Sequence, residues 1–168
     1  MRAEKLGFTL YDEPLQQELH EILQLVETDM TLFYRHLANL TTDADQSDQD
    51  LFSVVSDAYY DVDSLQQHDK QRICAWLRSY QQQLIQHDIS DSDRRQKMNA
   101  VNPKYVLRNY LAQLAIDDAE QGDFDLIHTL LECLRHPYDE QVDMLRFAEK
   151  RPDWARDRAG CSMLSCSS

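Results

Sequence analysis

The chain has 168 residues but only three glycines and four prolines. Glycine and proline form most tight turns and interrupt helices, so a sequence this poor in them favours helices over a turn-rich β-fold. Phosphate-binding loops need several closely spaced glycines, because the backbone must approach the phosphates. Gly7, Gly122 and Gly160 are too far apart to form such a loop. The scarcity of glycine therefore predicts an all-α fold without a nucleotide-binding glycine loop.

Two long segments of the first half carry apolar side chains every three or four residues, the spacing of one helix face. The first covers residues 14–30 and has proline at its start, where proline suits a first helical turn. The second covers residues 64–87 and is opened by a capping-box pattern of Ser64 and Gln67. We expect one helix over each segment.

The second half shows the same periodicity at residues 104–121 and 124–135. Gly122 lies between them, at the position just past a helix end where glycine is common. Asn102 before Pro103 marks a break, because the residue before proline avoids the helical region. With shorter helices elsewhere, we expect a compact all-α arrangement of about seven or eight helices. Residues 1–159 are expected to form the helical region and residues 160–168 a flexible tail of cysteine and serine.

The formal net charge of −13 restricts the partners of the chain. Nucleic-acid binding requires clustered lysine and arginine, and anionic membrane surfaces attract basic segments, so neither partner is expected. No apolar run approaches the roughly 20 residues of a membrane span, and the first residues contain no signal-peptide core. We therefore expect a cytoplasmic protein whose four cysteines are thiols.

Two patterns that could suggest a metal site fail. Asp43, Asp45 and Ser47 begin like a calcium-binding EF-hand loop, but aspartate and valine occupy the positions that need glycine and glutamate. Cys133 and His136 are spaced like two zinc ligands, but no second pair lies nearby. The residues by themselves therefore predict no metal, cofactor-binding or catalytic residue in this chain.

The second half nevertheless contains an ordered series of specific motifs. "MNAVNPKYVLRNYLAQLAI" is followed by "AEQGDF", "LLECLRHPYDEQ", "RPDWA" and a terminal "SCSS". In this order and spacing, the series closely resembles the C-terminal end of the selenoprotein O family. The opening "MRAEKLGF" resembles an internal segment of that family, so the resemblance covers nearly the whole chain. Val142 and Arg151 depart from it, since the family commonly has proline there.

The resemblance implies a function for the intact protein. Family members are kinase-like folds that act as protein adenylyltransferases, moving AMP from ATP onto Ser, Thr or Tyr hydroxyls of other proteins. The family's nucleotide-binding lysine and arginines, catalytic acid and magnesium ligands precede the region resembled here. We therefore expect the C-terminal helical part of a kinase-like fold, inactive alone, with Met1 an internal methionine of a longer protein. ATP, Mg²⁺, protein substrates and a kinase-like core in cis then belong to the full-length enzyme.

Five residues are candidates within this resemblance. Asn102, Arg108 and Asn109 of "NPKYVLRN" are polar, and a structural role is expected for them. Cys166 matches the position where the family has selenocysteine or cysteine, which makes it, with Cys161, a candidate redox residue. A reactive thiol would need nearby positive charge, for which two arginines lie upstream.

A second interpretation stays open at this point. The chain could be a free-standing acidic helical module for protein interaction, with the acidic stretch at residues 41–50 as a contact feature.

Overall fold

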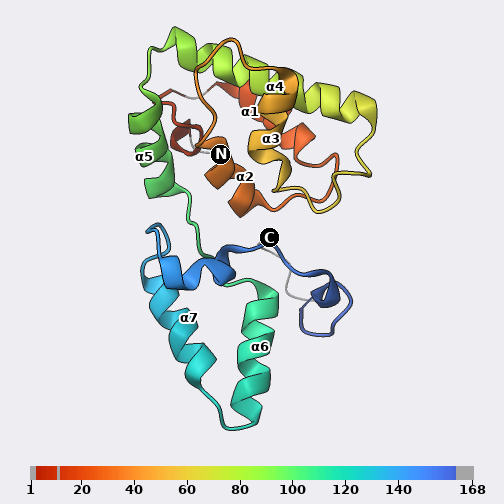
Figure 1. Cartoon of the computed structure of the whole chain (residues 1–168), viewed down its shortest axis with the longest axis vertical. Helices are drawn as coiled ribbons and strands as arrows, with labels where there is room; N and C mark the ends of the chain where they lie inside the picture. Colours follow the sequence, from red (N-terminus) through yellow and green to blue (C-terminus); the bar gives the residue numbers. More distant parts are fainter. Residues whose placement is uncertain (1–2, 11, 162–168) are drawn as a thin grey trace. The chain divides into compact units, whose positions relative to one another are not determined.

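The computed structural model describes residues 3–10 and 12–161. These residues form seven α-helices and three 3-10 helices, and their β-structure is limited to one isolated bridge (Figure 1). The all-α class and the expected seven or eight helices are confirmed over this range. None of these helices combines the length and apolar character needed to cross a lipid bilayer. The elements are η1 (Ala3–Leu6), α1 (Glu13–Ile22), α2 (Met30–Leu37), α3 (Asp48–Ser56), α4 (Gln67–Gln86), α5 (Asp91–Val101), α6 (Asn109–Glu120), α7 (Asp125–Arg135), η2 (Val142–Ala148) and η3 (Asp153–Ala155).

The chain divides into two compact units, Met1–Asn102 and Pro103–Ser168, called the N-unit and the C-unit below. Each unit has its own cluster of buried apolar side chains. The division falls at the break that the Asn-Pro dipeptide predicts. The proposed boundary at residue 160 stays a prediction, because residues 162–168 lie outside the described part of the chain.

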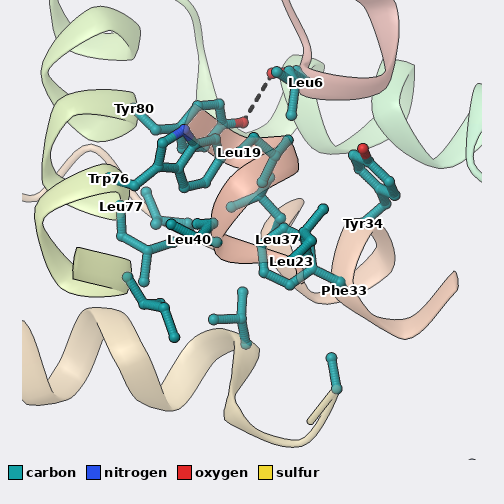
Figure 2. Close-up of a cluster of buried hydrophobic side chains, with 14 of the residues drawn as sticks. Leu6, Leu19, Leu23, Phe33, Tyr34, Leu37, Leu40, Trp76, Leu77 and Tyr80 are labelled. Atoms are coloured by element: carbon teal, nitrogen blue, oxygen red, sulfur yellow. Dashed lines mark hydrogen bonds between the residues drawn. The ribbon is translucent and has the colours of Figure 1, made fainter. Parts of the chain in front are cut away.

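The core of the N-unit forms where α4 packs against α1 and α3. On α4, the rings of Trp76 and Tyr80 stack with centroids 5.4 Å apart. Both polar ends find acceptors. The Trp76 indole N–H donates to the Leu15 carbonyl at 2.8 Å. The Tyr80 hydroxyl donates to the Leu6 carbonyl at 2.9 Å (Figure 2). Trp76 and Tyr80 are thus buried with their polar groups hydrogen-bonded, which favours one packing arrangement.

The single helix expected over residues 14–30 is wrong, because the structure contains α1 and α2 with a non-helical connection. Asp29 begins α2 by accepting a hydrogen bond from the Leu32 N–H at 3.0 Å. The Asp29 N–H itself donates to the Ala58 carbonyl at 2.8 Å. The Asp29 N–H thus bonds to a distant segment instead of to a carbonyl one helical turn earlier. Apolar periodicity reports no such distant bond, so it could not locate the end of α1.

The expected capping box at Ser64 is also wrong. Ser64 lies in a turn, where its N–H donates to the Asp61 carboxylate at 3.0 Å, and α4 begins three residues later without a side-chain cap. A capping box forms instead at the start of α3. There the Asp50 N–H donates to the Ser47 hydroxyl at 3.2 Å, and the Ser47 N–H donates to the Asp50 carboxylate at 3.0 Å. The hydrogen bonds from Ser47 lower the pKa of Asp50.

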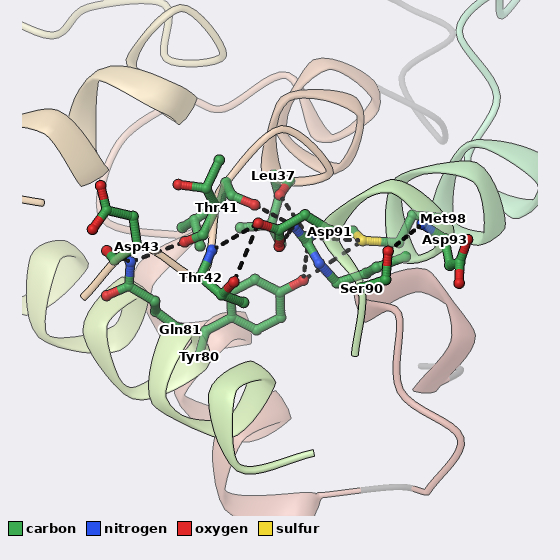
Figure 3. Close-up of polar contacts among 12 residues, drawn as sticks. Leu37, Thr41, Thr42, Asp43, Tyr80, Gln81, Ser90, Asp91, Asp93 and Met98 are labelled. Carbon is green, nitrogen blue, oxygen red and sulfur yellow. Dashed lines mark hydrogen bonds and ion pairs between the residues drawn. The ribbon is translucent and has the colours of Figure 1, made fainter. Parts of the chain in front are cut away.

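Among the described residues of the N-unit, Arg94 on α5 is a completely buried arginine, with 0% of its surface exposed. Its guanidinium donates to the carbonyls of Leu37 and Leu40 and to the Tyr80 hydroxyl, and it pairs with Asp91 at 3.2 Å. Figure 3 shows Leu37, Tyr80 and Asp91 converging from three segments. A buried charge is costly unless it is paired and hydrogen-bonded, so these contacts fix α5 to the end of α2 and to α4.

Gly7 has a packing role next to this arginine. Its backbone has a φ of +79°, a conformation that residues other than glycine rarely adopt. A Cβ atom there would lie 2.6 Å from the Arg94 Cγ. Glycine is therefore required where the turn after η1 covers the buried arginine.

The C-unit is built on the α6–α7 hairpin (Figure 1). The turn contains Gly122 just past the end of α6, with a φ of +87° and its N–H donating to the Ala119 carbonyl at 3.0 Å. This position and the end of α7 before His136 confirm the sequence predictions. Among the described residues of the unit, the buried apolar cluster consists of Tyr105, Tyr110, Leu111, Ala115, Leu130, Cys133, Phe147, Ala148, Ala155 and Cys161.

Candidate functional site

The two segments with the most specific resemblance lie against each other in the C-unit. The N–H groups of Lys104 and Tyr105 both donate to the Pro137 carbonyl, at 2.7 and 3.1 Å. The Tyr105 hydroxyl donates to the Gln141 carbonyl at 3.0 Å, and the Lys104 ammonium pairs with Glu140. The motifs around "NPKYVLRN" and "PYDEQ" are therefore two sides of one hydrogen-bonded junction.

This junction corrects the predicted start of the helix at residue 104. α6 begins only at Asn109, because the backbone donors of the preceding residues bind the segment after α7 instead of a helical turn. Gln141 completes the junction with its side chain. Its amide nitrogen donates to the carbonyls of Cys133 and His136, at 3.0 and 2.8 Å. Gln141 thus satisfies carbonyl groups that the C-terminus of α7 leaves open.

The polar candidates of "NPKYVLRN" occupy positions where helices end or begin. Asn102 is 2% exposed, and its side-chain amide donates to the Lys5 carbonyl at 2.9 Å. The Asn102 carbonyl accepts a hydrogen bond from Arg35 at 3.3 Å. Arg108 is buried at the start of α6, and Asn109 is the first residue of that helix. The contacts of Asn102 agree with the structural role expected for it.

A cleft of about 550 Å³ lies in the C-unit, lined by α6, the start of α7 and the chain around η2 and η3. Its wall includes Trp154, which is 49% exposed and meets the Tyr110 ring edge-on at a centroid distance of 6.1 Å. Carboxylates outnumber cations along it, and the half-exposed Trp154 ring can attract a cation, so the charge of the cleft suits a cationic group. The charged side chains that line it are Asp118, Asp123, Asp125, Glu149, Arg146 and Lys150. The sequence prediction missed this cleft, because its lining comes from separate segments and forms no local motif.

Of the two redox candidates, the structure describes Cys161. Cys161 is buried in the C-unit core, with its N–H donating to the Arg158 carbonyl at 3.1 Å. Cys166 lies outside the described residues. The Arg158 guanidinium pairs with Asp117 and lies 5.6 Å from the centroid of the Trp154 ring. The positive charge of Arg158 therefore interacts with Asp117 and Trp154.

The other two thiols have environments that oppose reactivity. Burial raises the pKa of Cys133, and burial together with the nearby Asp48 carboxylate raises the pKa of Cys74. A raised pKa reduces the thiolate fraction at neutral pH, and the thiolate is the nucleophile and metal ligand. Over residues 3–10 and 12–161, no group of three or more His, Cys, Asp or Glu side chains is placed to hold a metal ion.

Comparison with known proteins decides the family. The family model described as "Protein adenylyltransferase SelO" matches residues 1–135, which is more than half of the chain. The chain belongs to the SelO family. Its similarity to the C-terminal end of selenoprotein O proteins, first visible in the motifs, is thereby confirmed as membership of that family.

Curated relatives in the SelO family agree over the full length of the chain. Proteins named "Protein nucleotidyltransferase YdiU" are 52% identical over 180 residues in Rhodopirellula baltica and 48% identical over 171 residues in Aromatoleum aromaticum. Each alignment covers 100% of this chain but only 33% and 32% of the relative. The chain therefore spans about a third of the length of these relatives, and the comparison supports a nucleotidyltransferase-type family.

Proposed function

We propose that the chain is the C-terminal helical part of a protein adenylyltransferase, an enzyme that transfers AMP from ATP to Ser, Thr or Tyr hydroxyls of proteins. The observation that carries this proposal is the family match over residues 1–135, with 52% identity to a nucleotidyltransferase along the whole chain. In the intact enzyme, ATP and Mg²⁺ bind to the part of the polypeptide that this chain does not span.

The isolated chain is proposed to be inactive. The nucleotide-binding and metal-binding groups of the resembled family precede the region that this chain matches. The residues of the motifs also have structural partners: Tyr105 and Gln141 bind each other, and Asn102 binds Lys5. Their hydrogen bonds hold helix ends together, which is a supporting role within a larger enzyme.

Two measurements on the purified 168-residue chain test this proposal. With Mg²⁺ and ATP labelled on the α-phosphate, we expect no label on added protein substrates or on the chain itself, while the whole Rhodopirellula baltica relative serves as the active control. Calorimetric titration with ATP should give no binding heat. Magnesium-dependent transfer by the chain alone would overturn the proposed inactivity, and failure of the whole relative to transfer AMP would overturn the proposed reaction.

A further inference from the structure

Helix α7 has one wide apolar side, and only part of it is buried. Its inner face packs into the C-unit core through Leu130 and Cys133, which are both buried. Phe124, at the start of the helix, and Ile127 and Leu131 on it have 54%, 39% and 48% of their surfaces exposed. The exposed row therefore extends the apolar side of α7 beyond the part that the C-unit core covers, as on a helix whose apolar side packs against more than one neighbour.

These three residues, called the outer stripe below, form one continuous row. Positions separated by three, four and seven residues lie above one another on a helix. The row is bordered by the exposed side chains of Glu132 and Arg135, which pair with each other at 2.6 Å. An apolar centre beside a polar rim is the composition of a contact surface.

The size of the outer stripe argues for a partner on the same polypeptide. Three half-exposed side chains offer on the order of 300 Å² of contact, given the roughly 150–250 Å² of a fully buried aromatic side chain. A stable interface between separate molecules needs about 800 Å² on each partner. Within one polypeptide the contact forms at a high effective concentration, so a small apolar surface is enough.

We propose that the outer stripe packs against the portion of the SelO-family polypeptide that this chain does not span. That portion is about two thirds of the relatives' length, since the chain covers 33% of the Rhodopirellula baltica protein. The inference rests on the proposed function in assuming that the chain works as part of the longer enzyme. Because the stripe carries no charge, its partner surface is apolar.

The test compares one pair of substitutions in two settings. Ile127→Gln with Leu131→Gln makes the stripe polar and keeps good helix-forming residues. The first setting is the isolated chain. The second is a chimera in which this chain replaces the aligned 180 residues of the Rhodopirellula baltica relative. The matched control is Ile85→Gln with Leu145→Gln, which changes the same residue types at exposed positions (44% and 48%) outside the stripe.

We expect the stripe pair to lower the melting temperature of the chimera by about 5 °C or more and that of the isolated chain by less than about 2 °C. The control pair should change neither protein by more than about 2 °C. Equal losses in chimera and isolated chain would show that the stripe is covered within this chain. A concentration-dependent dimer of the isolated chain that the stripe pair abolishes would assign the surface to a second copy. Either result, or an unchanged chimera, overturns the proposal.

Two further experiments cover a chimera that does not fold and distinguish this proposal from the proposed function. If the chimera does not fold, the glutamines are placed in the relative itself at the positions aligned with Ile127 and Leu131, and the same shift is expected. AMP transfer by the unsubstituted chimera separates the two proposals. An active chimera that is indifferent to the stripe pair refutes the contact alone. If the stripe pair destabilises a folded chimera but the whole relative itself fails to transfer AMP, the reaction alone is refuted.

Discussion

The phenol of Tyr105 exchanges hydrogen bonds with the main chain of Gln141: it donates to the carbonyl at 3.0 Å and accepts from the N–H at 3.3 Å. These residues are 36 positions apart. The contact joins the segment before α6 to the segment after α7, so one side chain closes the base of the α6–α7 hairpin.

Tyr105→Phe should therefore destabilise the C-unit while leaving its packing volume unchanged. Removal of the hydroxyl leaves partly buried main-chain groups of Gln141 without this partner, at a cost of about 1 kcal/mol. Urea unfolding measures the difference. Tyr138→Phe, at a half-exposed tyrosine of the same unit, is the control and should change the unfolding free energy by less than about 0.5 kcal/mol. Equal effects of the two substitutions would contradict the structural role of Tyr105.

Substitution of the buried Arg94 should lower the unfolding free energy more than Tyr105→Phe does. Arg94→Met should lower the unfolding free energy by about 3 kcal/mol, because it removes the cation that pairs with Asp91 and the donor to the carbonyls of Leu37 and Leu40. Arg95→Met, at the adjacent exposed position, is the matched control and should stay within about 0.5 kcal/mol of the unsubstituted chain. Chemical denaturation followed by circular dichroism measures both. A loss no larger than that of the control would mean that the Arg94 contacts contribute nothing.

Two glycines allow the clash at Gly7 to be separated from backbone strain. Both Gly7 and Gly122 have positive φ, but a Cβ at Gly7 meets Arg94 at 2.6 Å, whereas a Cβ at Gly122 meets nothing within 4 Å. Gly122→Ala should cost about 1 kcal/mol from backbone strain alone. Gly7→Ala should cost at least about 1 kcal/mol more, because atoms of the buried arginine must also move. Thermal unfolding of the two variants gives the difference, and equal costs would refute the predicted clash.

Alkaline pH should destabilise the N-unit through its buried tyrosines. Burial raises the pKa of Tyr80 to about 12, above the value near 10 of an unfolded tyrosine. The folded state holds this proton more tightly, so the stabilisation is complete below about pH 10 and is lost as the pH rises toward 12. The unfolding free energy should fall by up to about 1.4 kcal/mol per pH unit for this one group. Burial also raises the pKa of Tyr34 and Tyr59, which adds to the slope.

Urea titrations between pH 8 and 11.5 measure this dependence. Tyr80→Phe should be less stable at pH 8, because the bond to Leu6 is lost, but its stability should fall less steeply above pH 10. The matched substitution is Tyr138→Phe, at a half-exposed tyrosine, which should leave the slope unchanged. If Tyr80→Phe had the slope of the unsubstituted chain, Tyr80 would not be the group responsible.

The thiols should react at different rates in the folded and unfolded chain. Cys133 and Cys161 are buried, so iodoacetamide at pH 7.5 should alkylate each at least about tenfold more slowly in the folded chain than in urea. Mass spectrometry of the digested chain gives each rate separately. Similar rates with and without urea would show that the C-unit core opens freely. The same data test the redox prediction for Cys166, which requires a rate above that of the unfolded chain.

Local signals located the helix ends that depend on the residues beside them. Pro103 explains why α5 ends at Val101, Gly122 explains the turn after α6, and the end of α7 at Arg135 precedes a proline by two positions. In each case the decisive interaction lies within a few residues. Propensity and periodicity report such interactions directly.

The sequence predictions of helix ends were wrong where residues far apart in the sequence interact. The connection between α1 and α2 is held by a bond from Asp29 to Ala58, and the late start of α6 by bonds from Lys104 and Tyr105 to Pro137. No local pattern encodes these partners. The cleft beside Trp154 was missed for the same reason, since tertiary packing brings its lining residues together. The family motifs were recognisable because they are local, although their role is a contact between two of them.

The hydrogen bond between Asn102 and Lys5 spans 97 positions and brings the last residue of the N-unit next to its first helical turn. A folded body whose entry and exit are neighbours can be inserted into a host protein, or cut and rejoined at a new point, without stretching its backbone. The N-unit therefore has the geometry of a domain that tolerates insertion and circular permutation. A circular permutant joined from Asn102 back to residue 3 and opened in the loop between α2 and α3 should keep the same buried core.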